Sequence, residues 1–331
     1  MLKLSRAPTR TPPPPPQAPP PRPNPLQHRT IPILFGSIAL LAFSSYGTYL
    51  YITLTRPPAT PIPSAPSAQP DVSWRYDTIA RGFDETVDFP ESLLRIKELR
   101  KKLLFKAQGD VLEVSIGTGR NLEYYDWGLE GQAGPQGKKG KVRSFTAVDI
   151  SGGMLGVARE KFSRLFPENL GTRWIVADAS KEVPSAPGGV GDKQGGLGGR
   201  KYDTVVQTMG LCSADDPVAL LKNLGNCVKE GDGRILLLEH GRGNLEWLNG
   251  VLDNFSEAHA KEFGCWWNRD LEKIVSESGL DVVDMHSIWW HGGTTWWIEL
   301  RRPKASLPNS TAGLVGSSKP QVDEGAKRKW W

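Results

Sequence analysis

The residues with the clearest chemical meaning form a glycine-rich turn in the run Asp110-Val111-Leu112-Glu113-Val114-Ser115-Ile116-Gly117-Thr118-Gly119. Glycines in such a turn let the backbone approach a ligand closely and tolerate positive φ, and we expect Gly119 to face the ligand with no room for a side chain. Position 122 is Leu, which breaks the G-x-G-x-x-G fingerprint of dinucleotide sites. Glu113 suits a charged amino group better than a phosphate. The turn therefore disfavours an NAD-dependent dehydrogenase.

Two more carboxylates follow apolar segments further along the chain. Asp149 ends Phe145-Thr146-Ala147-Val148, and its two oxygens can accept hydrogen bonds from both hydroxyls of a ribose. Asp178 follows Ile175-Val176-Ala177, where a carboxylate can bind an adenine amino group. A ligand that combines an amino acid, a ribose and an adenine is S-adenosylmethionine (SAM). The three acidic residues and the turn together predict a SAM site.

Short apolar runs that alternate with helical patterns must position these residues. The alternation predicts an α/β fold with a doubly wound, mostly parallel sheet of seven strands, whose last two, Leu280–Trp290 and Thr295–Leu300, form an antiparallel β-hairpin. Two Gly-rich insertions, Gly128–Lys141 and Pro184–Arg200, are expected to be exposed loops. The other strands are expected at Asp110–Ser115, Ser144–Val148, Thr172–Val176, Tyr202–Gln207 and Arg234–Glu239, and helices at Asp71–Lys106, Gly153–Phe166, Pro217–Val228 and Asn268–Ser278.

Few side chains near these strand ends are suited to acid–base catalysis. The candidates for a base are His240 after the fifth strand and Tyr76 in the helical lead-in, with His291 in the hairpin turn as a weaker one; a structural role is the alternative for each histidine. Methyl transfer from a sulfonium is an in-line displacement in which positioning supplies much of the acceleration. A base is needed only for an acceptor that is protonated at the working pH. Three tryptophan pairs are candidates for an acceptor pocket or for lipid contact, with core packing as the alternative: Trp266-Trp267, Trp289-Trp290 and Trp296-Trp297.

The three cysteines, Cys212, Cys227 and Cys265, are an odd number without a CxxC pair. This count and spacing argue against a disulfide framework and against a structural zinc site. Each is expected to be a small buried hydrophobe, and no metal is predicted.

Composition divides the chain into segments. Ile31–Leu54 is uncharged and, at about 1.5 Å per residue, long enough to cross an apolar core of about 30 Å. Pro-rich stretches on both sides leave it nothing to pack on, which favours a transmembrane helix over a buried one. Residues 1–30 are basic, Pro-rich and free of acid, which is typical of mitochondrial targeting, 55–70 form a Pro-rich linker, 71–302 the folded domain and 303–331 a disordered tail. Because the excess of basic residues lies outside the domain, nucleic acid is a poor partner.

Residues 71–302 resemble a class I SAM-dependent methyltransferase. Tyr76-Asp77-Thr78-Ile79-Ala80 with Phe83-Asp84 is similar to the opening segment of ubiquinone/menaquinone-type methyltransferases. The segments 205–213, 238–240 and 263–269 are similar to those of the membrane-anchored alkyl-thiol methyltransferases of animals. With its basic N-terminus and single span, the whole chain resembles the fungal mitochondrial inner-membrane methyltransferase-like family linked to respiratory assembly.

The resemblance implies a SAM pocket in which Gln207 lies beneath the methionine end. Ser115 stands where the family pattern has Gly, and a serine fits there if its φ is negative. The residues implied for the pocket are Glu113, Ser115, Gly117, Gly119, Asp149, Ile150, Asp178, Ala179 and Gln207.

These features predict methylation of a small lipophilic acceptor at a membrane. A thiol is favoured over a quinone precursor, because a thiol pKa of about 8.5 leaves some thiolate at neutral pH whereas a ring hydroxyl near about 10 needs a placed base. The alternative is a SAM-fold respiratory assembly factor with weak or no catalysis and with respiratory-chain partners. The predicted location is the mitochondrial inner membrane, with the domain in the intermembrane space, because five basic residues precede the span: Lys3, Arg6, Arg10, Arg22 and Arg29.

Overall fold

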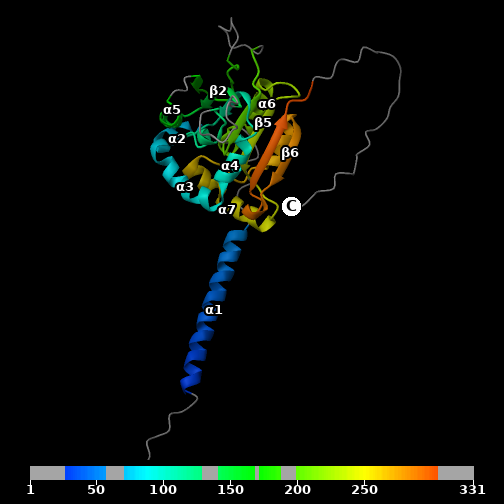
Figure 1. Cartoon of the computed structure of the whole chain (residues 1–331). Helices are drawn as coiled ribbons and strands as arrows, with labels where there is room; N and C mark the ends of the chain where they lie inside the picture. The colour runs from blue at the N-terminus through cyan, green and yellow to red at the C-terminus, as the bar shows by residue number, and fades with distance from the viewer. Residues whose placement is uncertain (1–26, 57–70, 129–140, 168–170, 188–198, 305–331) are drawn as a thin grey trace, which may run out of the picture. The chain divides into compact units, whose positions relative to one another are not determined.

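The computed structural model describes residues 27–56, 71–128, 141–167, 171–187 and 199–304 (Figure 1). The predictions for the targeting segment, the linker, the C-terminal tail and most of both insertions lie outside these residues. Two compact units divide the chain, Met1–Leu54 and Thr55–Trp331, and each is described by itself.

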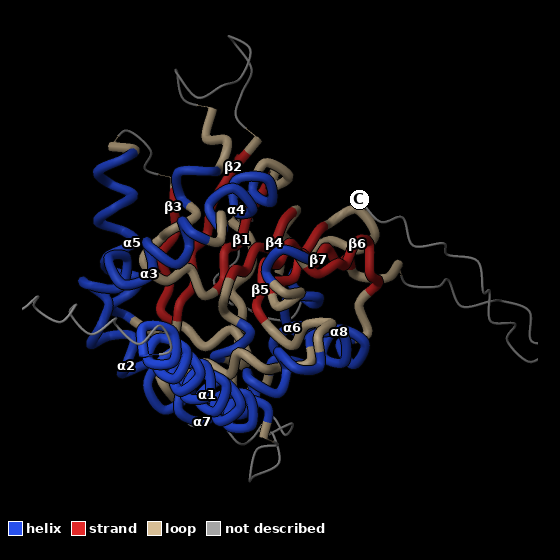
Figure 2. The backbone as a smooth tube through the Cα atoms, turned by 90° about the horizontal axis from the view of Figure 1, so that it is seen from below, coloured by secondary structure: helices blue, strands red, loops and turns tan. Residues whose placement is uncertain are grey.

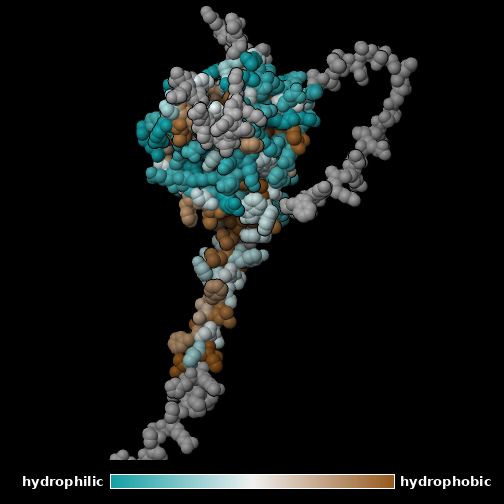
Figure 3. All heavy atoms as spheres, viewed as in Figure 1, coloured by the Kyte–Doolittle hydropathy of each residue, from teal (hydrophilic) through white to brown (hydrophobic). Residues whose placement is uncertain are grey.

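The described part of the first unit is helix α1 (Gln27–Thr55). Its stretch Thr30–Leu54 has a mean hydropathy of 1.5 and no buried residue, and it is the only described helix long and apolar enough to cross a membrane. Figure 3 shows hydrophobic side chains along α1, whereas the visible face of the second unit is mainly hydrophilic. The predicted apolar helix is therefore present, and its apolar stretch buries none of its residues.

The second unit is built on one sheet in the order β3-β2-β1-β4-β5-β7-β6 (Figure 2). Strands β1 to β5 run parallel, and β7 is antiparallel to both of its neighbours, β5 and β6. The predicted seven-stranded sheet with a terminal antiparallel pair is confirmed, and the carboxyl ends of β1, β2, β4 and β5 meet at one edge. The strands are β1 (Gly109–Val114), β2 (Val142–Asp149), β3 (Thr172–Val176), β4 (Thr204–Thr208), β5 (Arg234–His240), β6 (Asp281–Ser287) and β7 (Thr295–Arg301).

Helices cover both faces of the sheet, as the alternating sequence pattern predicts. Val111 and Leu112 are neighbours in β1 but belong to opposite hydrophobic clusters, because successive side chains of a strand point to opposite faces. Helices α4 and α5 complete the cluster that contains Val111, and α6 and α8 complete the other. The helices of this unit are α2 (Ser73–Ile79), α3 (Phe83–Leu93), α4 (Ile96–Leu104), α5 (Gly152–Leu165), α6 (Pro217–Cys227), α7 (Glu246–Phe263) and α8 (Leu271–Ser278), with the 3-10 turns η2 (Ala80–Gly82), η3 (Leu122–Tyr124), η4 (Leu211–Ser213) and η5 (Trp289–His291).

Candidate functional site

The turn after β1 contains three residues with positive φ: Ser115 at 52°, Gly117 at 58° and Gly119 at 76°. Glycine adopts this region freely, whereas another L-residue is destabilised there by about 1–2 kcal/mol. The Gly117 N–H donates to Asp149 Oδ2 at 2.7 Å, which ties the turn to the end of β2. The condition of a negative φ, under which a serine fits this position, is therefore not met by Ser115. The serine keeps a glycine-like conformation, and the turn is strained at this residue.

Gly117 and Gly119 have different surroundings. A Cβ at Gly117 would meet no atom within 4 Å, so this glycine borders open space at the carboxyl edge of the sheet. A Cβ at Gly119 would lie 2.5 Å from Leu122 Cδ1 and 3.1 Å from Ala158 Cβ. A side chain at Gly119 would therefore clash with the core and not with a ligand, contrary to the expectation, and of the two glycines it is Gly117 that borders open space.

Gln207 in β4 is fully buried beside this turn. Its Nε2 donates to Ser115 Oγ at 3.4 Å, while its Oε1 has no hydrogen-bond partner among the described residues. Gly210 closes over the pair, because a Cβ there would lie 2.5 Å from Gln207 Nε2. A buried carbonyl oxygen without a donor is costly, so this position favours a ligand that donates a hydrogen bond.

Two of the predicted carboxylates lie at the ends of neighbouring strands, Asp149 at the end of β2 and Asp178 just after β3. Asp149 is buried, which raises the pKa of its carboxyl group, and its oxygens accept hydrogen bonds from Ser151 N at 2.9 Å and from the turn. Each oxygen keeps a second lone pair for a ligand hydroxyl. Ile150 beside it is 41% exposed. Asp178 accepts from Ser180 N at 2.9 Å, and Ala179 next to it is buried.

Glu113 lies beneath the turn and is fully buried. Its two oxygens accept hydrogen bonds from Asn121 Nδ2 and Tyr125 Oη, both at 2.8 Å, and Asn121 Oδ1 in turn accepts from Arg100 at 3.0 Å. Burial raises the pKa of Glu113 to about 7. The carboxyl group thus has a role inside the protein, and its predicted contact with a ligand amino group stays a prediction.

Helix α2 bridges the carboxyl edge of the sheet. Asp77 Oδ1 accepts from Ser151 Oγ at 2.6 Å and from Gly153 N at 2.8 Å, at the start of α5. The neighbouring Tyr76 Oη lies 2.7 Å from Ser213 Oγ, in the loop after β4. Burial raises the pKa of Tyr76, so its hydroxyl is a hydrogen-bonding group at neutral pH and not a base. The helix therefore spans from β2 to β4, across the turn after β1.

The other candidate base, His240, lies with two cysteines. The ligating atoms of Cys212, His240 and Cys265 are all within 4.8 Å of one another, and His240 Nε2 is 2.9 Å from Cys265 Sγ. Burial acts to lower the pKa of His240, but its charge interaction with Cys212 raises it overall. All three cysteines are buried and free, as expected. Cys212 and Cys265, however, lie close to each other and to His240, and only Cys227 lies apart from this group.

The sequence alone did not lead us to group Cys212, His240 and Cys265. One signal could have done so, because each of them lies in one of the segments similar to alkyl-thiol methyltransferases, 205–213, 238–240 and 263–269. The three predicted tryptophan pairs differ in burial: Trp296 and Trp297 are buried in the core, so neither the acceptor pocket nor lipid contact applies to them, Trp266 and Trp267 are half-buried, and Trp289 and Trp290 are exposed. His291 is buried with Nε2 2.6 Å from the Leu94 carbonyl oxygen, which gives it the structural role.

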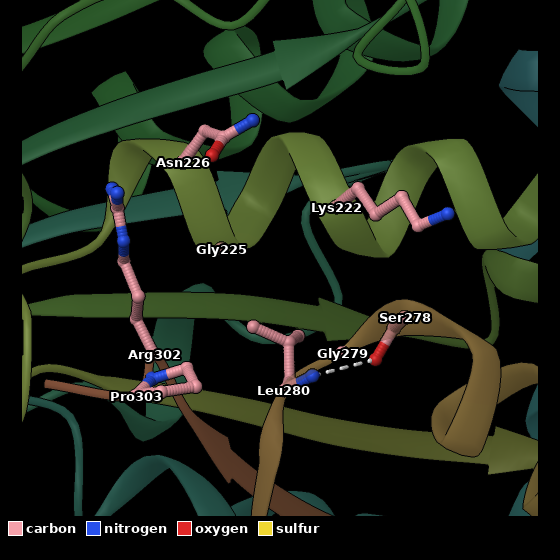
Figure 4. A pocket seen from close by; sticks show the side chains of 8 residues that line it. All are labelled: Lys222, Gly225, Asn226, Ser278, Gly279, Leu280, Arg302 and Pro303. Carbon is pink, nitrogen blue, oxygen red and sulfur yellow. Dashed lines mark hydrogen bonds between the residues drawn. The ribbon is translucent and has the colours of Figure 1, made fainter. Parts of the chain in front are cut away.

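A surface pocket between α6 and the start of β6 is separate from this site (Figure 4). Leu280 and Arg302 are among its lining residues, and Leu280 N donates to Ser278 Oγ at 3.3 Å within it. It lies where α6 ends and β6 begins, at the amino edge of the parallel strands. Ligands of doubly wound sheets bind at the opposite edge, so the candidate site remains the one formed by the turn after β1.

Comparisons with known proteins agree with this geometry. A family model for the methyltransferase domain matches residues 90–285. The chain is 37% identical over 244 residues to the mitochondrial methyltransferase OMS1 of Saccharomyces cerevisiae, covering 72% of this chain and 48% of the yeast protein, so it spans about half the length of that relative. Similar solved structures include a chain of the Haloferax volcanii complex between the Trm112 methyltransferase activator and a methyltransferase (16% identity, TM-score 0.49, 69% of this chain, 98% of that chain) and a SAM-dependent methyltransferase from Clostridium acetobutylicum (13%, 0.44, 67%, 99%).

Proposed function

The chain belongs to the methyltransferase-domain family, and from this premise we propose that it is a membrane-anchored enzyme that uses SAM to methylate a small lipophilic thiol. The choice of a thiol as the methyl acceptor rests on the environment of the two candidate bases. Tyr76 Oη is hydrogen bonded to Ser213, and His240 Nε2 is in contact with Cys265. An acceptor that is partly ionised at neutral pH needs no stronger base than this, and thiols meet that condition.

The residues of the site fit the cofactor. The unpartnered Gln207 Oε1 suits the ammonium group of the methionine part, the lone pairs of Asp149 suit the ribose hydroxyls, and the open space at Gly117 allows close approach to the backbone. SAM supplies an electrophilic methyl group on a sulfonium. The protein holds the acceptor in line with that group, and α2 shields the edge of the sheet through Tyr76 and Asp77.

Anchoring rests on α1. Its stretch Thr30–Leu54 is 25 residues long with a mean hydropathy of 1.5 and no buried residue, which suits a helix whose side chains face lipid. The mitochondrial name of the yeast relative and the acid-free N-terminus support the mitochondrial inner membrane. A tethered domain suits an acceptor that partitions into lipid, since a water-soluble one would gain nothing from the anchor.

Turnover by the purified full-length chain tests the acceptor. We expect SAM-dependent methylation of a long-chain alkanethiol and none of a demethyl-quinol, because the quinol hydroxyl requires a placed base. Methylation is measured by mass spectrometry of the product. If the chain methylated only the quinol, and His240→Ala abolished that activity, the proposal of a thiol acceptor would be overturned. SAM binding without turnover of either acceptor would instead favour the assembly factor, for which the strained Ser115 is the supporting feature.

The side of the membrane follows from the positive charges before the span. Five basic residues precede the apolar stretch Thr30–Leu54 and a single Arg56 follows it closely, so we propose that the N-terminus stays in the matrix and the domain lies in the intermembrane space. Protease added to mitoplasts should then degrade the domain while matrix proteins survive. A domain that resists protease until the inner membrane is dissolved would place it in the matrix.

A further inference from the structure

Three segments distant in sequence bring one imidazole and two thiols together at the carboxyl edge of the sheet. Cys212 lies in η4 after β4, His240 ends β5, and Cys265 follows α7. Both cysteines are less than a tenth exposed, and the three ligating atoms fall within 4.8 Å of one another. A packing role for a small buried hydrophobe does not require this convergence.

The backbone fixes the three segments to one another. The Glu239 carboxylate accepts from the N–H groups of Gly210 and Leu211, each at 3.1 Å, which joins β5 to the loop that carries Cys212. The Cys212 carbonyl oxygen accepts from Trp266 N at 3.0 Å and from Arg269 Nε at 3.2 Å, which joins that loop to the segment that carries Cys265. The group is therefore held in place by supporting hydrogen bonds, as built ligand sites are.

The spacing suits a tetrahedral metal ion. With metal–sulfur bonds of about 2.3 Å and metal–nitrogen bonds of about 2.1 Å, tetrahedral ligand atoms lie about 3.5–3.8 Å apart. The pair His240 Nε2 and Cys265 Sγ, at 2.9 Å, would separate slightly to reach this spacing, and no pair would need to move by more than about 1 Å. Thiolates with an imidazole select zinc among the common divalent ions, since calcium and magnesium prefer oxygen ligands.

We propose that Cys212, His240 and Cys265 bind a zinc ion whose fourth position takes the acceptor thiol as a thiolate. The proposal deepens the proposed function and rests on it for the identity of the fourth ligand. Three protein ligands with an open position are the arrangement of catalytic zinc sites, whereas structural sites have four. The zinc ion would thus ionise the acceptor thiol, a task for which the strand ends offer no free base.

The step balances without an added reactant. The thiol loses its proton to solvent when its sulfur binds the metal. The thiolate sulfur then attacks the SAM methyl carbon, the carbon–sulfur bond of the sulfonium breaks, and its electron pair stays on the sulfur of S-adenosylhomocysteine. The product is a neutral thioether, a weaker ligand than a thiolate, and it leaves the metal.

Cobalt substitution of the full-length chain tests the site. After removal of metal by a chelator, we expect about one Co²⁺ per chain, with the visible and thiolate charge-transfer bands of tetrahedral sulfur coordination. Cys212→Ser, Cys265→Ser and His240→Ala should each weaken Co²⁺ binding at least about tenfold. Cys227→Ser is the matched control, because Cys227 is also buried but lies outside the group, and it should bind as wild type. SAM titration without metal verifies that each variant is folded.

The metal site and the proposed function fail in different ways. Wild-type protein that binds no Co²⁺, or cysteine variants that bind it as wild type does, would overturn the metal site. An alkanethiol should shift the Co²⁺ spectrum and its methyl thioether should not; a thiol that is methylated without such a shift would overturn the acceptor role of the metal while leaving the thiol methyltransferase intact. A Co²⁺ site in a chain that methylates no thiol would support the metal site and remove the proposed function.

Discussion

Gly117→Leu is expected to weaken SAM binding at least about a hundredfold, a loss of about 2.7 kcal/mol. A side chain at this position enters the open space on the ligand side of the turn and meets no protein atom at its Cβ. The positive φ of 58° adds a folding penalty of about 1–2 kcal/mol, so the protein should still fold. Titration calorimetry measures the affinity, and thermal unfolding of the SAM-free protein measures the stability.

Two neighbouring substitutions distinguish a blocked ligand site from a damaged turn. Gly119→Ala should lower stability by about 2–5 kcal/mol, because strain at φ 76° adds to the clash of its Cβ with Leu122 and Ala158. Ser115→Gly should retain SAM binding and gain up to about 1 kcal/mol of stability, since the relief of strain exceeds the added freedom of the unfolded chain. Wild-type affinity in Gly117→Leu would show that the cofactor does not approach this turn.

The sequence predicted the sheet well because its strands are short apolar runs between clear turns. Thr172–Val176 agrees with β3 at both ends, and the other strand boundaries agree or differ by one or two residues, except that β6 ends three residues before the predicted Trp290. No helix was predicted over α7, although Leu248, Val251, Leu252 and Phe255 recur at helical spacing. The buried residues of α7 are Asn249 and Ser256, so its packing differs from that of the core helices.

The position of a candidate residue was predictable where one residue type at one strand end suffices: Asp149 ends β2, as expected. Backbone conformation was less accessible: the positive φ of Ser115 lies in a turn that a hydrogen bond from Gly117 ties to Asp149, a contact distant in sequence that no local pattern reveals. The group of Cys212, His240 and Cys265 required the tertiary structure, because the end of an unrecognised helix places its third member.

Stability of the SAM-free protein is expected to fall by about 3 kcal/mol as pH rises from about 4.5 to about 7, through Glu113 alone. Burial raises the pKa of this carboxyl group from 4.5 to about 7. Between these values the unfolded chain has released the proton and the folded protein still binds it. The stability contributed by protonated Glu113 is therefore fully present below about pH 4.5 and is lost as the pH rises through about 7.

Glu113→Gln should remove this contribution and flatten the pH dependence, because a neutral amide of similar size remains beside Asn121 and Tyr125. Denaturant unfolding of both proteins in the same detergent, at several pH values from 4.5 to 8, gives the two curves. The difference between them should change steadily through the acidic range and level off above neutrality, once Glu113 has ionised in the folded protein as well. Parallel curves over the whole range would mean that the carboxyl group ionises as readily when folded as when unfolded, held charged by Arg100 nearby.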